Sequence, residues 1–240
     1  MIVTHFDKNF YEWGKYYLIS INKYNPELQV YISGVNLKKF QIEELMRIHP
    51  KTYIKNHIIE FNGIQKRCNG GGKDAEWKIM MQCRVSKVIL EAIQYAKEND
   101  IKTLIVTNAD MLLCKQINLQ DYKNDIYLLE NDEIHRKEKQ ILNGVIIFNI
   151  NKKTENFFIE YNKMNENRKL VWFDDQRYLY NCFNKYREDI EISRLQQKYY
   201  VNTSYIHDYD RGFEKERVFI SFHSGTKEFC MNACKKFLNI

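Results

Sequence analysis

The sequence predicts an α/β fold in which a largely parallel central sheet is covered by helices on both faces. Short apolar runs, typical of buried strands, alternate along the chain with segments whose apolar residues recur at helical spacing. Such alternation favours parallel strands joined by helices. The chain has 240 residues with only two prolines and nine glycines, and its sequence contains neither a linker nor an internal repeat. We therefore expect a single domain.

The first quarter of the chain is predicted to alternate strictly between strands and helices. The opening apolar residues suit a buried strand, and Trp13, Tyr17 and Ile21 then recur every four residues, as on one face of a helix. Pro26 separates this helix from the next apolar run. In order, we expect a strand at 1–6, a helix at 10–24, a strand at 28–33, a helix at 41–48 and an extended segment at 52–61.

A glycine cluster at 69–77 is expected to be a loop, with a mobile lid as the alternative. It is not a phosphate-binding P-loop, because Gly72 and Lys73 are followed by Asp74 and the required earlier glycine is missing. One long amphipathic helix is predicted at 75–99. Further on, we expect strands at 103–108, 125–130 and 141–149, helices at 154–164 and 174–186, a strand at 217–222 and a helix at 227–238.

Composition and charge narrow the classes of function. The net charge is +6, but basic and acidic residues are mixed through the chain, whereas a nucleic-acid binder would gather its basic residues into a stripe. The surplus fits an anionic small substrate, or a weak attraction to an acidic membrane surface. No apolar stretch reaches about 18 residues, so no membrane-spanning helix is expected. The first residues lack the features of a signal peptide, and the six cysteines are dispersed. A cytoplasmic protein is therefore predicted.

The last predicted helix carries a broad apolar face that includes Phe229, Cys230, Cys234, Phe237 and Leu238. We expect this face to pack onto the domain. A peripheral contact with the inner face of the membrane is the alternative, because two lysines lie beside the apolar face.

The stretch LIVTNADMLL, residues 104–113, places polar residues at the tip of the most apolar predicted strand. Ligands of open α/β sheets bind beyond the carboxyl ends of strands. Asp110 offers a carboxylate suited to Mg²⁺ or Mn²⁺, and Asn108 offers an amide oxygen. Alone, Asn-Ala-Asp is more often an ordinary turn.

Four further segments strengthen the hypothesis of a site. They are THFDKNFY (4–11), LNGVIIFN (142–149), WFDDQRYLY (172–180) and FHSGTKE (222–228). Each has an ordinary interpretation by itself. His223 alone would more often be a structural histidine, the two adjacent carboxylates at 174–175 alone suit a helix N-terminus, and Asn143-Gly144 alone is a common turn dipeptide.

Together and in this order, these segments resemble glycosyltransferases of the GT-A fold. The likeness is to the family that includes glycogenin and the bacterial lipopolysaccharide galactosyl- and glucosyltransferases. That family has an Asp-x-Asp motif after an apolar strand, an Asn-x-Gly-Val segment, an Asp-Gln pair and a C-terminal His-x-Gly-x-x-Lys motif. Here these correspond to Asn108-Ala109-Asp110, Asn143-Gly144-Val145, Asp175-Gln176 and His223-Ser224-Gly225-Thr226-Lys227. The resemblance spans nearly the whole chain.

The resemblance implies a single GT-A domain with a mixed, mainly parallel sheet, a nucleotide-binding half at about 1–110 and an acceptor half at about 111–240. It implies a role for each motif residue. Asp110 and His223, with Asn108, would hold Mn²⁺ or Mg²⁺. The nucleotide-sugar donor would be bound by Thr4, Asp7, Asn9, Phe10, Arg84, Asn108, Asn143, Gly225 and Lys227. The residues at the reacting sugar would be Asp175, Gln176 and Asp174.

Three positions depart from the family pattern. Asn108 stands where the first acid of the metal motif is expected, which removes one charge from the metal site. Glu228 stands where the family commonly has Pro-Trp, and Asp174 adds a carboxylate beside the Asp-Gln pair. An inverting enzyme needs a carboxylate base for the acceptor hydroxyl, so the sequence leaves open whether the stereochemistry is retaining or inverting.

The expected function is transfer of a hexose from a nucleotide diphosphate sugar to a glycan or lipid-linked acceptor, with UDP favoured by resemblance and GDP open. Nucleic acid is not an expected partner. Two alternatives remain. One is a catalytically degenerate nucleotide-binding or partner-binding module of the same fold, because Asn108 replaces an acid. The other is a sugar-phosphate nucleotidyltransferase, which is disfavoured because residues 1–12 contain no glycine.

Overall fold

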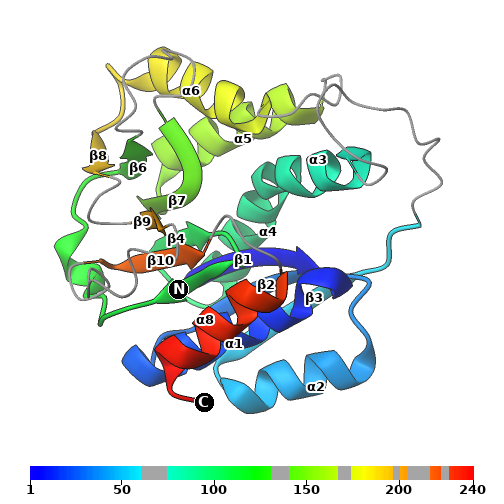
Figure 1. Cartoon of the computed structure of the whole chain (residues 1–240). Coiled ribbons are helices and arrows are strands. Elements are labelled where there is room, and N and C mark those ends of the chain that lie inside the picture. Colours follow the sequence, from blue (N-terminus) through cyan, green and yellow to red (C-terminus); the bar gives the residue numbers. More distant parts are fainter. Residues whose placement is uncertain (61–74, 131–140, 167–173, 197–200, 205–216, 223–226) are drawn as a thin grey trace.

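The computed structural model describes residues 1–60, 75–130, 141–166, 174–196, 201–204, 217–222 and 227–240. Its centre is a seven-stranded sheet with the strand order β3-β2-β1-β4-β7-β6-β8 (Figure 1). The strands of this sheet are β1 (Ile2–Asp7), β2 (Val30–Val35), β3 (Thr52–His57), β4 (Thr103–Thr107), β6 (Ile126–Glu130), β7 (Ile141–Asn149) and β8 (Ile192–Gln196).

The sheet is mixed and mainly parallel, as the sequence predicts. Strands β3, β2, β1 and β4 run parallel, with Ile2 paired to Val30 on one side and to Ile105 on the other. Strand β7 runs antiparallel to both β4 and β6, and β8 is parallel to β6. The reversal at β7 brings the beginning of that strand to the edge of the sheet where β1 and β4 end.

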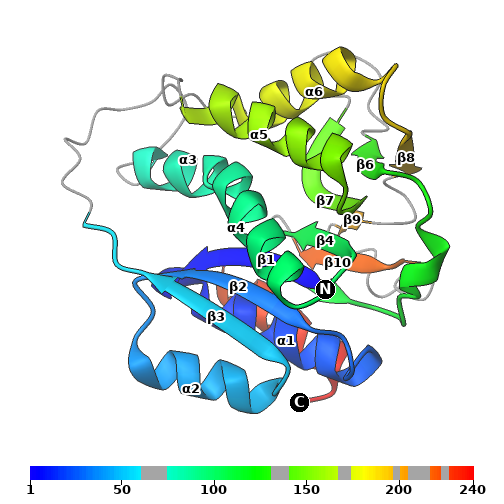
Figure 2. The same cartoon turned by 180° about the vertical axis from the view of Figure 1, so that it is seen from behind.

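Helices cover both faces of this sheet (Figures 1 and 2). On one face, α1 (Tyr11–Tyr24) and α2 (Lys39–Ile48) pack with Tyr17, Leu18 and Leu45 against Ile2 and Ile32. On the other face lie α4 (Val85–Glu98), α5 (Lys152–Glu166) and α6 (Asp174–Tyr186). Alternate residues of each strand point to opposite faces, so strands covered on both sides are apolar almost throughout. This explains the apolar runs by which the strands are recognised in the sequence.

The core on the α4–α6 face is rich in aromatic rings. The phenyl rings of Phe148 on β7 and Phe158 on α5 lie 4.3 Å apart, and Phe157 meets Phe158 edge to face. All three side chains are completely buried. These contacts fix α5 against the strand that begins beside the candidate site.

A second, three-stranded sheet lies beside the first and has the order β5-β10-β9. Its strands are β5 (Met111–Leu113), β10 (Phe219–Phe222) and β9 (Val201–Ser204), and β10 is antiparallel to β5 and parallel to β9. Helix α8 (Lys227–Leu238) packs on this region with Cys230, Cys234, Phe237 and Leu238 buried. The predicted packing of the last helix onto the domain is therefore confirmed for these four residues. The side chain of Phe229 lies outside the described part.

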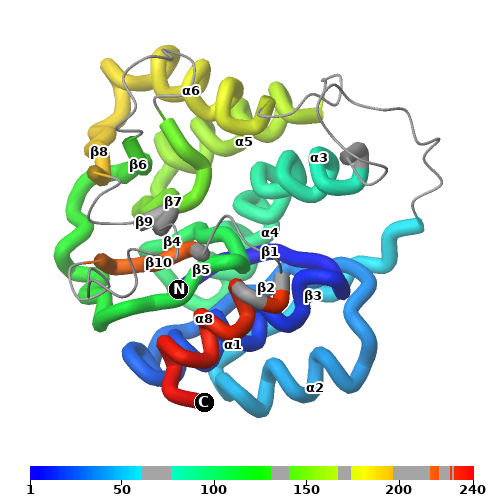
Figure 3. Tube along the Cα trace, in the orientation of Figure 1, coloured from blue at the N-terminus to red at the C-terminus, as the bar shows by residue number. Residues whose placement is uncertain are grey.

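Figure 3 shows the C-terminal helix α8 alongside α1, the first long helix of the chain. The contact joins Tyr16 of α1 to the buried cysteines of α8 in one apolar cluster. None of the described helices is long and apolar enough to cross a membrane.

The prediction of one long helix at 75–99 is wrong. The structure has two helices, α3 (Ala75–Cys83) and α4, with a break at Arg84. The Arg84 amide donates to the carbonyls of both Met80, at 3.0 Å, and Met81, at 3.2 Å, a shared bond typical of a helix end. Neither proline nor glycine occurs there, so no local signal in the sequence indicates the break. Of the predicted glycine loop, residues 69–74 lie outside the described part, and residues 75–77 are helical.

The sequence pattern also missed three strands, β5, β8 and β9. Strand β5 has only three residues, and β8 reads ISRLQ, in which Leu195 alone is buried. Strands this short or this polar lack the alternation by which strands are recognised.

Candidate functional site

The carboxyl ends of β1 and β4 meet at one edge of the central sheet. These strands are parallel neighbours, with Val3 paired to Val106. Asp7 is the last residue of β1, and the segment Asn108–Asp110 directly follows β4. Polar side chains that are far apart in the sequence are therefore brought together where a ligand of an open α/β sheet binds.

The antiparallel strand β7 adds its first residues to the same place. Thr107 of β4 pairs with Val145 of β7, which sets Gly144 opposite the residue after the strand, Asn108. A Cβ atom added to Gly144 would lie 3.2 Å from the Met111 side chain and 4.0 Å from the Asn108 amide nitrogen. The missing side chain thus allows β7 to approach the polar turn closely.

A cavity of about 240 Å³ is lined by residues from the end of β1, the segment after β4, the start of β7 and helix α3. Five of them were predicted from the sequence, namely Asp7, Phe10, Asn108, Asp110 and Asn143. Six further polar or large residues were not predicted: His5, Phe6, Trp77, Lys78, Met81 and Gln82. The first two belong to β1 and the other four to α3, so this helix forms one wall of the cavity.

Asp7 organises the loop that follows β1. Its Oδ1 accepts hydrogen bonds from the backbone N–H groups of Asn9, at 2.9 Å, and Phe10, at 3.1 Å. Its Oδ2 accepts from the Asn9 side-chain amide at 3.2 Å and from the indole Nε1 of Trp77 at 2.5 Å. These four bonds use all the lone pairs of the carboxylate. Asp7 therefore begins the 3₁₀ turn Lys8–Phe10 and holds α3 across the cavity.

His5 forms a second link between β1 and α3. Its Nε2 lies 2.8 Å from the carbonyl oxygen of Met81, to which it donates as the neutral ring. Burial, followed by the nearby Arg84 charge, lowers the pKa of His5 from 6.5 to about 4, although the bond to Met81 acts in the opposite direction. His5 is thus neutral at pH 7. It lies two residues before Asp7 on the same face of β1, which is the signal that could have predicted it.

Asn143 joins the cavity to the start of α6. Its side-chain amide nitrogen donates to Oδ2 of Asp175, and its amide oxygen lies 3.4 Å from Nε2 of Gln176. Asp175 is only 2% exposed and lies in the first turn of α6, where the helix dipole favours a negative charge. Burial, together with the Asp175 charge, raises the pKa of the neighbouring Tyr161 hydroxyl well above its usual value. The predicted set Asn143, Asp175 and Gln176 is therefore in direct contact.

The adjacent Asp174 has a different environment. Its carboxylate lies 2.6 Å from the guanidinium of Arg177, one turn along α6, and its side chain is 4% exposed. The two neighbouring carboxylates therefore have different partners, with Asp175 on the Asn143 amide and Asp174 on a cation.

Asp110 lies near the beginning of α8. Burial and, in addition, the charge of Asp110 raise the pKa of the Cys230 thiol in the first turn of this helix. The register of the small sheet agrees, because Met111 pairs with Ser221 near the end of β10. His223 and Gly225, predicted to bind the metal and the diphosphate, lie outside the described residues. Lys227 begins α8, but its side chain is also outside the described part.

The side-chain oxygen atoms of Asp110 and Asn108 suit a hard divalent cation. A carboxylate from Asp110 and an amide oxygen from Asn108 are ligands of the type that Mg²⁺ and Mn²⁺ accept. Among the residues that the structure describes, no group of three histidine, cysteine or acidic side chains is close enough to hold a metal by itself.

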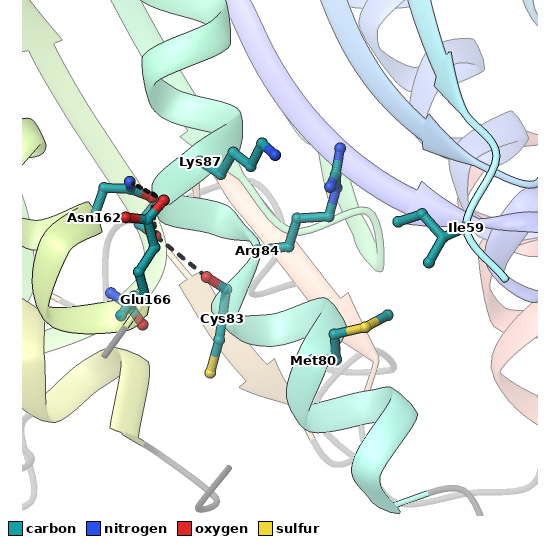
Figure 4. Close-up of a pocket in the computed structure, with 9 residues that line it drawn as sticks. Ile59, Met80, Cys83, Arg84, Lys87, Asn162 and Glu166 are labelled. Atoms are coloured by element: carbon teal, nitrogen blue, oxygen red, sulfur yellow. Dashed lines mark hydrogen bonds between the residues drawn. The ribbon is translucent and has the colours of Figure 1, made fainter. Parts of the chain in front are cut away.

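Three predicted donor-binding residues lie elsewhere. Thr4 is buried on β1, outside the set of described residues that line the cavity. Asn9 is not among the described residues that line the cavity, but its side chain donates a hydrogen bond to Asp7, which does line it. Arg84 lines a second cavity on the opposite side of α3 (Figure 4).

Comparison with known proteins identifies the fold. No protein-family model matches the sequence, and no curated protein sequence matches it. Solved structures do match. The galactosyltransferase LgtC in complex with donor and acceptor sugar analogs is 10% identical, with a TM-score of 0.59 over 99% of this chain and 95% of LgtC. A glycosyltransferase involved in glycosylation of the major capsid of PBCV-1 is 11% identical, with a TM-score of 0.55 over 100% of this chain and 98% of that chain.

The bifunctional glycosyltransferase WbbM is also similar, with a TM-score of 0.61 and 11% identity. The match covers 99% of this chain but only 49% of WbbM, so this chain spans about half of that protein. At this level of identity the likeness establishes the fold. The GT-A architecture expected from the motifs is therefore confirmed.

Proposed function

We propose that the protein is a metal-dependent glycosyltransferase that moves a hexose from a nucleotide diphosphate sugar, with UDP as the favoured carrier, to a glycan or lipid-linked acceptor. The observation that carries the proposal is the cavity at the ends of β1 and β4, which gathers Asp7, Phe10, Asn108, Asp110 and Asn143. The fold shared with LgtC, a galactosyltransferase whose structure holds donor and acceptor sugar analogs, supports the same function.

In this proposal, the ends of β1 and β4 bind the two parts of the donor. Phe10, which is 42% exposed and lines the cavity, offers an aromatic face for a nucleobase. Asp7 fixes the backbone on which Phe10 is carried. Asp110 and Asn108, with His223, would hold Mn²⁺ or Mg²⁺, and the cation would supply positive charge to neutralise the diphosphate leaving group. Gly225 and Lys227 bind the diphosphate oxygens.

The sugar lies toward β7 and α6. The amide of Asn143 is positioned by Asp175 and Gln176, and these three residues bind the sugar hydroxyls and lie at the anomeric centre. Asp175 is buried in the first turn of α6, where it accepts the hydrogen bond from the Asn143 amide. Asp174 is paired with Arg177 and orients the start of the helix rather than acting on the acceptor.

The competing function is a nucleotide-binding module without turnover. The observation in its favour is Asn108, a neutral residue where the family has an acid. Both functions predict binding of a nucleotide to the same cavity, and only the first predicts cleavage of the donor.

The test is hydrolysis or transfer of UDP-glucose and UDP-galactose in the presence of Mn²⁺, followed by release of UDP. The wild type is compared with Asp110→Asn and with Asp121→Asn, an exposed carboxylate outside the cavity. We expect release of UDP from one donor, lost in Asp110→Asn and retained in Asp121→Asn. Binding of the nucleotide without any release of UDP would favour the module without turnover.

A further inference from the structure

A second cavity, of about 290 Å³, lies on the other side of α3. Helix α3 is the wall that the two cavities share: Met81 and Gln82 face the first, whereas Met80 and Cys83 face the second. The remaining walls of the second cavity are Ile59, the first turn of α4 and the end of α5. Its volume is at the lower end of the range of small-molecule sites, about 300 Å³.

Arg84 lines this cavity, and most of the hydrogen-bonding capacity of its guanidinium is unused by the described residues. The side chain is only 10% exposed, and its Nε has no hydrogen-bond partner within the described part of the chain. Its Nη2 donates one long bond, 3.4 Å, to the Ser33 hydroxyl. An arginine has five N–H donors, and a buried charge without partners is costly.

The nearest carboxylate does not satisfy Arg84. Glu91 lies 4.0 Å from Nη2, and it also contacts His57 at 3.1 Å and Lys55 at 3.8 Å. One carboxylate therefore faces three basic groups. A buried guanidinium in this condition requires an acceptor beyond the described residues, and an anion gives the strongest hydrogen bonds.

The two sides of the cavity differ in chemistry (Figure 4). Lys87 lies one turn along α4 from Arg84, so this side is basic. The α5 side carries Asn162, Asn165 and Glu166. Asn162 accepts a hydrogen bond from Ser86 at 3.1 Å and donates one to Glu166 at 2.9 Å. Amide groups and a carboxylate are the usual partners of sugar hydroxyls, which both donate and accept hydrogen bonds.

We propose that this second cavity binds an acidic monosaccharide unit, with its carboxylate or phosphate on Arg84 and Lys87 and its hydroxyls on Asn162, Asn165 and Glu166. Neither a neutral sugar nor a bare anion uses both sides. In the proposed glycosyltransferase, this acidic unit would be part of the acceptor, and that assignment rests on the proposed function. Binding of the acidic unit to the cavity does not depend on that function. The geometry gives Arg84 a partner other than the donor expected from the resemblance.

The test is titration calorimetry of the whole protein with glucuronate, glucose 6-phosphate, glucose and inorganic phosphate. We expect glucuronate or glucose 6-phosphate to bind at least about tenfold more tightly than either glucose or phosphate, because one charge-assisted hydrogen bond accounts for that factor. Which of the two acidic sugars binds identifies the oxyanion as carboxylate or phosphate.

Variants connect the binding to this cavity. Arg84→Gln and Lys87→Gln should each weaken the acidic sugar at least about fivefold, since each removes one charged contact. Lys97→Gln is the matched control, because it makes the same change on α4 outside the cavity. Lys87 is exposed, so its variant remains informative if Arg84→Gln fails to fold.

Three results would overturn the inference: no binding of either acidic sugar, equal binding of glucose or phosphate, or variants that titrate like Lys97→Gln. UDP with Mn²⁺ is titrated separately into the wild type. Its outcome tests the donor cavity, so failure of the proposed function and failure of this inference are distinguishable.

Discussion

Acid should destabilise the fold through His5, and the effect can be worked out from its contacts. As the neutral ring, His5 donates from Nε2 to the Met81 carbonyl, and its buried Nδ1 has no acceptor among the described residues. A proton added to Nδ1 would therefore be buried without a partner, beside the positive charge of Arg84. This is why the pKa of His5 falls from 6.5 to about 4.

The lowered pKa of His5 determines how stability changes with pH. The unfolded chain binds the proton near pH 6.5, whereas the folded chain binds it only near pH 4. The contribution of His5 to stability is therefore fully present above pH 6.5 and is lost as the pH falls from 6.5 toward 4. At pH 5, the loss is about 2 kcal/mol relative to pH 7.5, and it approaches about 3 kcal/mol below pH 4.

The assay is urea denaturation at pH 7.5 and pH 5.0 for the wild type and for His5→Gln, which keeps an amide donor for Met81. Other histidines and carboxylates titrate in both proteins, so the difference between the two pH dependences isolates His5. We expect the wild type to lose about 2 kcal/mol more than the variant between these pH values. Equal losses in the two proteins would refute the assignment of a buried, neutral His5.

Three other changes test the packing and the site. Trp77→Phe removes the indole donor to Asp7 and should lower the free energy of unfolding in urea by about 1–3 kcal/mol; an unchanged value would mean that α3 is not held by this bond. Asn143→Ala removes the side-chain amide that donates a hydrogen bond to the buried Asp175. It should lower kcat for cleavage of the nucleotide sugar at least about tenfold, with little change in UDP affinity. A loss of UDP affinity alone would contradict the place of Asn143 at the sugar. Phe148→Ala, in the completely buried aromatic cluster, should cost about 3–5 kcal/mol in urea denaturation, and a cost below about 1 kcal/mol would contradict the packing of α5 on β7.

The sequence predicts the inner strands of the central sheet well because these strands are buried on both faces, whereas the edge strand β8, in which Leu195 alone is buried, was missed. The apolar runs at β1, β4 and β7 are therefore nearly continuous, and polar residues mark the points where they end. Because β1 and β4 are parallel neighbours, those polar ends fall together, and Asp7, Asp110 and Asn143 could be placed in one site from their positions after or at the start of strands.

The wall made by α3 could not be predicted in the same way. The break at Arg84 has no proline or glycine to announce it, so the sequence predicted one helix where there are two. Trp77 and Met81 line the first cavity, whereas Met80, Cys83 and Arg84 line the second. Which cavity each residue faces depends on the tertiary placement of α3, which its sequence pattern does not indicate.

The most direct test of the central claim is titration calorimetry of the wild type and Asp110→Ala with UDP and GDP, each with Mn²⁺ and again with EDTA. We predict that one nucleotide, UDP in our account, binds the wild type only with Mn²⁺. Asp110→Ala should weaken this binding at least about tenfold, since Asp110 is the charged metal ligand in the proposed function. No binding of either nucleotide, or binding that neither EDTA nor Asp110→Ala changes, would contradict a metal-dependent donor site at the end of β4.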